Sequence, residues 1–103
     1  MPVSPSPVSL AFEEYGSGPP LLILHGLMGQ ARNWATTAKM LASEYRVLSV
    51  DLRNHGRSPC TTGMTYEEMA EDVAALAEAA GAPVKIIGHS MGGKVTMVTA
   101  LKY

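Results

Sequence analysis

One stretch decides how this chain folds: Val84-Lys85-Ile86-Ile87-Gly88-His89-Ser90-Met91-Gly92-Gly93. Its first part, residues 84–88, is a short apolar run that predicts a β-strand of the kind buried in a parallel sheet. Residues 91–101 have a helical composition and follow at once. The intervening turn contains a serine between Gly88 and Gly92, two residues whose missing side chains allow a strand and a helix to approach closely. The stretch therefore predicts a sharp strand-to-helix turn centred on Ser90.

The rest of the sequence repeats the alternation of strands and helices. Partial alternation of apolar and polar residues predicts a strand over 8–13, and the apolar runs 21–24 and 46–51 predict two buried strands. Apolar residues at helical spacing predict a helix over 34–41, between those two runs. Strands that alternate with helices pair in parallel through right-handed crossovers, so we expect an α/β layer architecture.

The longest predicted helix begins at Thr65, whose partner Glu68 completes a capping box, and ends at Gly81. One face of this helix is apolar and consists of Tyr66, Met69, Ala70, Val73, Leu76, Ala77 and Ala80. The opposite face is acidic, with Glu67, Glu71, Asp72 and Glu78. We interpret the acidic face as solvated surface rather than as a metal or substrate site.

The composition restricts the classes of function. With 103 residues, 47% hydrophobic and 17% charged, the chain suits one small globular domain, preceded by a flexible arm at 1–7. A net charge of -1 offers no basic field for nucleic acid or an anionic membrane, and the longest apolar run is far shorter than the roughly 20 residues of a membrane span. The single cysteine excludes an internal disulfide. We expect a cytoplasmic protein with a small, largely neutral ligand.

Ser90 is the candidate nucleophile. A helix that begins at Met91 directs its backbone N–H groups, and the positive end of its dipole, toward the place where an attacked acyl carbonyl becomes negative. Met91 N–H is one expected donor to that oxyanion. The alternative is a serine that merely caps the helix between two incidental glycines. The strand directly before the pentapeptide and the helix directly after it favour the nucleophile.

Polar loops follow the other two buried strands. Gly26 and Gly29 permit a tight loop, and we interpret His25 as holding that loop by hydrogen bonds rather than transferring protons. In the loop 51–58, Asp51 and Arg53 are interpreted as holding the backbone by charge-assisted hydrogen bonds, and no metal site is expected. Three larger side chains are core residues or, alternatively, the lining of an acyl pocket: Met28, Trp34 and Met91.

Together these loops resemble the α/β-hydrolase superfamily, through His25-Gly26, the loop 51–58 and Gly88-His89-Ser90-Met91-Gly92-Gly93. More narrowly, they resemble small serine acyl esterases and thioesterases. The resemblance implies a mainly parallel sheet in the order first, third, second, fourth strand. It implies Ser90 as the nucleophile and the Leu27 and Met91 N–H groups as oxyanion donors. It also implies a small acyl ester or thioester as substrate, an acyl-enzyme, and neither a metal nor an organic cofactor.

The chain departs from the superfamily in one respect, because the triad acid and histidine there follow the serine. Only thirteen residues follow Ser90, and all three histidines precede it. His89 is expected to face away from Ser90, and we do not assign a base role to His25 or His55. We therefore expect a partial domain, residues 8–103, truncated after the helix that follows Ser90. Two alternatives remain, a non-catalytic binding module and another cofactor-free reaction of the superfamily, such as haloperoxidase or carbon–carbon hydrolase chemistry.

Overall fold

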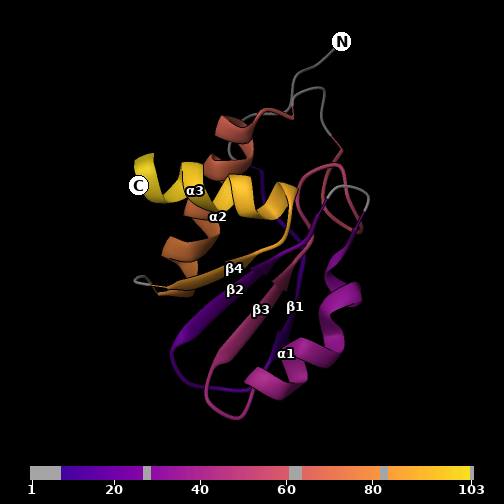
Figure 1. The fold of residues 1–103 in the computed structure, drawn as a ribbon, viewed down its shortest axis with the longest axis vertical. Helices are drawn as coiled ribbons and strands as arrows, with labels where there is room; N and C mark the ends of the chain where they lie inside the picture. Colours follow the sequence, from indigo (N-terminus) through magenta and orange to yellow (C-terminus); the bar gives the residue numbers. More distant parts are fainter. Residues whose placement is uncertain (1–7, 27–28, 61–63, 82–83, 103) are drawn as a thin grey trace.

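The structure is a computed structural model that describes residues 8–26, 29–60, 64–81 and 84–102. Its centre is a four-stranded sheet in the order β1-β3-β2-β4 (Figure 1). β2 pairs in parallel with β3 and with β4, whereas β1 pairs antiparallel with β3. The predicted strand order and the mainly parallel pairing are thus confirmed. The strands are β1 (Phe12–Tyr15), β2 (Pro20–Leu24), β3 (Arg46–Val50) and β4 (Lys85–Gly88).

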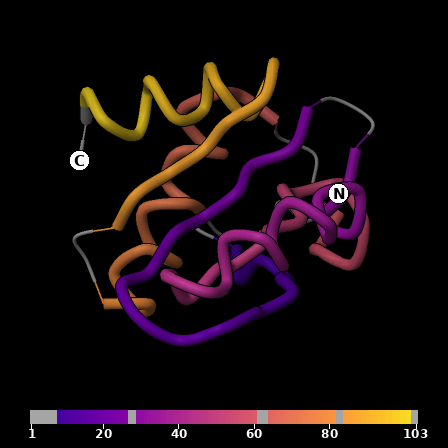
Figure 2. The backbone as a smooth tube through the Cα atoms, turned by 60° about the horizontal axis from the view of Figure 1, so that its bottom comes forward, coloured from indigo at the N-terminus to yellow at the C-terminus, as the bar shows by residue number. Residues whose placement is uncertain are grey.

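The helices cover both faces of the sheet, as Figures 1 and 2 show. A 3-10 turn, η1 (Ala31–Trp34), leads into α1 (Ala35–Leu41) on one face. α2 (Tyr66–Ala80) and α3 (Met91–Lys102) lie on the other. Successive strand residues point to opposite faces, so β2 and β3 supply both cores. One core joins Leu22, Leu24, Leu48 and Val50 to α2 and α3, and the other joins Leu21, Ile23 and Val47 to Ala38 of α1.

The first strand lies later in the sequence than predicted. Residues 8–13 were expected to pair, but β1 begins at Phe12. Val8 and Leu10 are buried in the core without being part of the sheet. Their segment is instead held by side chains, because Val8 N–H donates to Asp72 Oδ1 at 2.9 Å and Ala11 N–H donates to Ser58 Oγ at 2.8 Å. The alternation at 8–11 therefore reflects packing, and only residues 12 and 13 of the predicted strand pair.

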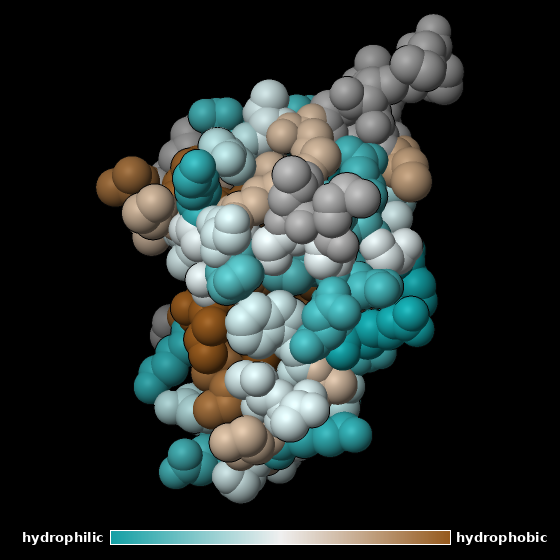
Figure 3. Space-filling view, turned by 45° about the vertical axis from the view of Figure 1, so that its right-hand side comes forward, coloured by the Kyte–Doolittle hydropathy of each residue, from teal (hydrophilic) through white to brown (hydrophobic). Residues whose placement is uncertain are grey.

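Within the described residues β4 lies at the edge of the sheet, and it is not buried on both faces. It pairs with β2 alone in the part of the chain that the structure describes. Lys85 and Ile87 are exposed, and Ile86 is half-buried. Figure 3 shows an apolar area, in brown, left of the centre of this face and surrounded by more polar side chains. The exposed large apolar residues of the described chain are Met40, Tyr66, Ile87, Met97 and Leu101.

The ends of α2 form as the sequence predicts. Thr65 Oγ1 accepts a hydrogen bond from Glu68 N–H at 3.1 Å, and Glu68 Oε1 accepts one from Thr65 N–H at 3.1 Å. The hydrogen bonds that Glu68 Oε1 accepts from Thr65 N–H and from the Thr65 hydroxyl lower the pKa of Glu68. At the other end, Gly81 adopts the left-handed conformation, with φ 98°, that ends many helices.

One residue of the acidic face was assigned wrongly. Asp72 is 1% exposed, whereas Glu67 and Glu78 are exposed as predicted. The Asp72 carboxylate accepts hydrogen bonds from Arg53 Nε at 2.7 Å and Arg53 Nη2 at 2.8 Å, in a bidentate pair with a buried guanidinium. The pair raises the pKa of Arg53 further above its ordinary value. Asp72 is thus the point at which α2, the loop after β3 and the segment before β1 meet.

Replacing Asp72 by asparagine tests the importance of this pair. Asp72→Asn leaves the buried Arg53 charge without its main partner, so we expect the free energy of unfolding to fall by about 3–5 kcal/mol. Urea denaturation measures the change, with Glu78→Gln on the exposed face of the same helix as the matched control. The control should change stability by less than about 0.5 kcal/mol. Equal effects of the two variants would contradict the assignment.

Candidate active site

Ser90 occupies a strained turn between β4 and α3. Its backbone φ is 55°, in the left-handed region that serine rarely adopts, and the residue is exposed. Such a conformation costs about 1–3 kcal/mol and persists only where the surroundings enforce it. Here His89 N–H donates to Leu24 O at 3.0 Å before the turn, and Lys94 N–H donates to Ser90 O at 3.1 Å after it. The predicted sharp turn is confirmed, and it presents Ser90 to solvent.

Gly88 and Gly92 permit this turn because α3 crosses very close to the ends of β2 and β4. A Cβ atom on Gly92 would lie 2.6 Å from the carbonyl oxygen of His25 and closer still to that of Leu24. A Cβ atom on Gly88 would lie 2.5 Å from Thr96 Oγ1. Real Cβ atoms do not approach other atoms so closely, so both positions need glycine. Gly93 has more room, because a Cβ atom there would lie 3.4 Å from Gly88 O.

The two adjacent glycines of α3 provide a matched pair of variants. Gly92→Ala would push α3 away from β2, and we expect it to lower the free energy of unfolding by about 1–3 kcal/mol. Gly93→Ala should be neutral or stabilise the helix by up to about 1 kcal/mol, because alanine favours helix. Urea denaturation of both variants measures the difference. Similar unfolding midpoints for the two variants would show that the close approach at Gly92 does not exist.

The predicted oxyanion donor, Met91 N–H, lies at the N-terminus of α3. Met91 is the first residue of this helix, and its N–H donates to no acceptor among the described residues. The loop after β2 lies against the same turn, since a Cβ on Gly26 would lie 3.4 Å from Ser90 Cβ (Figure 2). Leu27, the second predicted donor, lies outside the described residues. The structure thus brings together Ser90, Met91 and the start of the loop to which Leu27 belongs.

His25 holds this loop through both nitrogens of its buried ring. Leu52 N–H donates to Nε2 at 3.0 Å, so Nε2 carries no proton, and Nδ1 donates to Gly26 O at 2.7 Å. Burial lowers the pKa of His25, and the nearby His55 ring, whose centre is 4.9 Å away, acts in the same direction. The interpretation of His25 as a residue that holds the loop is confirmed. A neutral imidazole with both nitrogens engaged is not a base for Ser90.

The lowered pKa of His25 has a consequence for stability. Below about pH 6.5 the unfolded chain takes up a proton at His25 that the folded chain does not, so the folded state loses stability as the pH falls. In His25→Gln, which retains one donor and one acceptor, this contribution is absent. We expect the free energy of unfolding, measured in urea between about pH 7 and 5, to fall more steeply in the native protein than in the variant. Parallel slopes would contradict the assignment.

The loop after β3 is held by the charged side chains predicted for it. Asp51 Oδ1 accepts a hydrogen bond from Ala31 N–H at 2.6 Å, and Asp51 Oδ2 accepts one from Arg57 N–H at 3.3 Å. Gly56, with φ 50°, passes so near that a Cβ would lie 2.7 Å from Asp51 Oδ2. With the Arg53–Asp72 pair, these bonds confirm the structural interpretation of Asp51 and Arg53. The carboxylate of Asp51 is used for the backbone and not for chemistry at Ser90.

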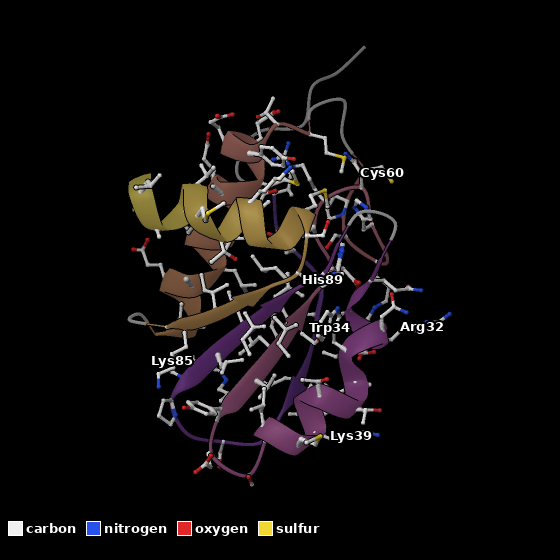
Figure 4. All side chains as sticks on the ribbon, in the orientation of Figure 1. Arg32, Trp34, Lys39, Cys60, Lys85 and His89 are labelled. Atoms are coloured by element: carbon white, nitrogen blue, oxygen red, sulfur yellow. The ribbon has the colours of Figure 1, made fainter. Side chains whose placement is uncertain are left out.

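Ser90 and His89 line different cavities, as alternation along the strand predicts. Ser90 belongs to a cavity of about 570 Å³ lined by Met64, Thr65, Tyr66, Glu67, Met69, Ser90, Met91 and Lys94. His89 belongs to another of about 410 Å³ lined by His25, Gly26, Gly29, Asn33, Trp34, Thr37 and His89. The rings of His89 and Trp34 are in contact there, 5.6 Å between centres (Figure 4). His89 is therefore not directed at Ser90.

The larger side chains considered for an acyl pocket separate in the structure. Met91 is 8% exposed and both belongs to the core and lines the Ser90 cavity. Trp34 lines the other cavity, and Met28 lies outside the described residues. Met64, Tyr66 and Lys94 were not predicted as lining residues. Of these three, only Lys94 could have been predicted from the sequence, because a residue four positions after Ser90 lies one helical turn along the same face.

Metal and membrane sites were also considered. Within the described ranges, no three His, Cys, Asp or Glu side chains form a group that could hold a metal ion. None of the helices described is both long and apolar enough to cross a bilayer.

Comparison with known proteins places this fold in a family. The family described as "alpha/beta hydrolase fold" matches residues 19–103. The chain is 42% identical to the sn-1-specific diacylglycerol lipase ABHD11 of Danio rerio, over 93% of this chain and 32% of that protein. It superposes on a marine microorganism esterase with a TM-score of 0.87 and 46% identity, over 90% of this chain and 36% of the other. It superposes on a malate-bound thermophilic esterase from Thermogutta terrifontis with a TM-score of 0.89 and 37% identity, over 98% of this chain and 39% of the other.

The chain therefore belongs to the alpha/beta hydrolase family. Its relatives include proteins named as lipases and esterases, and it has the α/β-hydrolase fold that the sequence motifs predicted. It spans about one third to two fifths of the length of these three relatives.

Proposed function

We propose that this chain provides the nucleophile and the oxyanion site of a serine hydrolase for carboxylic esters or thioesters. The observation that supports this most is the conformation of Ser90. Ser90 has φ 55°, is exposed in a cavity and directly precedes Met91, whose N–H has no acceptor among the described residues. This conformation costs free energy that a merely structural turn would not need. The names of the relatives point to the same chemistry.

The reaction follows the usual two steps of covalent catalysis. Ser90 Oγ attacks the acyl carbonyl carbon and gives up its proton to a base. The carbonyl oxygen becomes an oxyanion that accepts hydrogen bonds from Met91 N–H and Leu27 N–H. Collapse of this intermediate expels the alcohol or thiol, which takes up the proton, and leaves the acyl group on Ser90. Water then attacks the acyl-enzyme, releases the carboxylic acid and restores the serine.

The base is proposed to be a histidine outside residues 1–103, oriented by a carboxylate that also lies outside them. Two histidines in the chain are unsuited to the role on geometric grounds. Both ring nitrogens of His25 are engaged, and His89 lines the other cavity. The third histidine, His55, lies in the loop that Asp51 holds, and its Nδ1 is 2.9 Å from the carbonyl oxygen of Arg53. This ring nitrogen is therefore engaged by the backbone of its own loop. Without a base, a serine hydroxyl is a weak nucleophile, and loss of one triad member costs about 10⁴-fold in rate.

Covalent labelling tests the nucleophile. A fluorophosphonate probe should react with the full-length gene product, and peptide mapping should place the adduct on Ser90. Ser90→Ala should abolish the adduct and reduce ester hydrolysis by at least about 10³-fold. Ser43→Ala, at another exposed serine, is the matched control and should leave labelling unchanged.

Two results would overturn the proposal. Hydrolysis that survives Ser90→Ala would place the chemistry elsewhere. A well-folded full-length protein that neither binds the probe nor cleaves any ester would instead favour a non-catalytic binding module.

A further inference from the structure

Lys94 is held at the rim of the Ser90 cavity by an aromatic ring. It lies on α3 four residues after Ser90, and its ammonium nitrogen is 5.9 Å from the centre of the Tyr66 ring. Tyr66 is the first residue of α2, and both side chains line the cavity. An exposed lysine on a helix otherwise extends freely into water, whereas a cation over an aromatic face is attracted to it. The contact therefore keeps a positive charge beside the candidate nucleophile.

The surroundings of this charge favour an anion. Thr65 and Glu68 already cap the N-terminus of α2, so the positive groups at the cavity are Lys94 and the N-terminus of α3. Glu67, the one acidic residue in the described lining, opposes them. No ion pair joins Glu67 to Lys94 in the described chain, so the ammonium is not neutralised by it. One ammonium group and the N-terminus of α3 thus face one carboxylate.

The rest of the lining is suited to a chain of carbon atoms. Met64, Met69 and Met91 line the same cavity, and Met69 and Met91 are buried. Unbranched thioether side chains adapt to flexible apolar groups. The cavity therefore combines an apolar wall beside Ser90 with the side chain of Lys94, whose backbone lies about one helical turn after Ser90.

We propose that Lys94 selects acyl substrates that carry an anionic group a few atoms from the carbonyl that Ser90 attacks. This inference rests on the proposed esterase function and deepens it. The anion is a carboxylate on the acyl part or a phosphate on the alcohol part, since both offer the same charged oxygens to an ammonium group. It differs from the expectation, drawn from net charge alone, that the ligand is largely neutral.

Matched esters test this preference in the full-length gene product. The first pair is p-nitrophenyl hydrogen glutarate and its methyl ester, which differ in a terminal carboxylate on the acyl part. The second is the acetyl ester of glycerol 3-phosphate and that of glycerol, which differ in a phosphate on the alcohol part. The measured quantity is the ratio of kcat/KM for the charged ester to that for the neutral one. We expect this ratio to fall at least about fivefold in Lys94→Gln for one pair, and the affected pair identifies which part carries the anion.

Three further variants separate charge from other effects. Lys94→Arg should retain most of the preference, and Tyr66→Leu, which removes the ring beneath the ammonium, should reduce it by a smaller factor than Lys94→Gln. Lys39→Gln, the same change of charge on α1 and far from α3 in Figure 4, should leave the ratios unchanged. Added salt should lower the ratio in the native protein and have little effect in Lys94→Gln.

The outcomes distinguish this inference from the proposed function. If Ser90 is labelled and esters are hydrolysed, but neither ratio depends on Lys94, the inference is wrong and the esterase function stands. A ratio that falls equally in Lys39→Gln would also overturn it, because net charge and not the cavity would then be responsible. If neither labelling nor hydrolysis occurs, both proposals fail.

Discussion

The contact between Gly92 and the last carbonyl groups of β2 is the constraint on which the candidate site depends. A helix that packs directly on backbone carbonyls fixes the distance between α3 and the sheet without any side chain between them. The chain must then turn from β4 into α3 within very few residues, and Ser90 takes up the strain as a left-handed φ. The same closeness places the Met91 N–H and the loop at Gly26 beside the serine. The absence of a side chain at Gly92 thus helps to position both Ser90 and the Met91 N–H.

Local sequence patterns predicted the elements that are determined by residues close together in the sequence. The cap at Thr65 and the end of α2 at Gly81 depend on residues within a few positions of one another, and both form as expected. The strand–serine–helix turn was predictable for another reason, because the glycines that its packing on β2 requires lie beside Ser90 in the sequence. The core strands were also predictable, because burial on two faces demands the continuous apolar runs of β2 and β3. The strand order came from resemblance to a known family, and the pairing confirms it.

The features that were missed depend on partners far away in the sequence. Asp72 looked like one more residue of a solvated acidic face, since nothing near it shows that Arg53 is folded beneath the helix. The segment before β1 alternates like a strand, but its N–H groups find Asp72 and Ser58 and not a neighbouring strand. The contact between Lys94 and Tyr66 joins the starts of two helices, so neither helix alone reveals it. In each case the partner of the side chain or N–H group is set by tertiary packing, which the local sequence pattern does not specify.

The strained turn has a consequence for the identity of the nucleophile. Backbone atoms hold Ser90 in place, through the hydrogen bonds on either side of the turn and the close packing of α3 on β2. The backbone therefore fixes the position of residue 90 and does not depend on the serine hydroxyl. A thiol in the same place would stand at the N-terminus of a helix, which favours the thiolate over the neutral form. Ser90→Cys would convert this site into a cysteine nucleophile on an unchanged backbone.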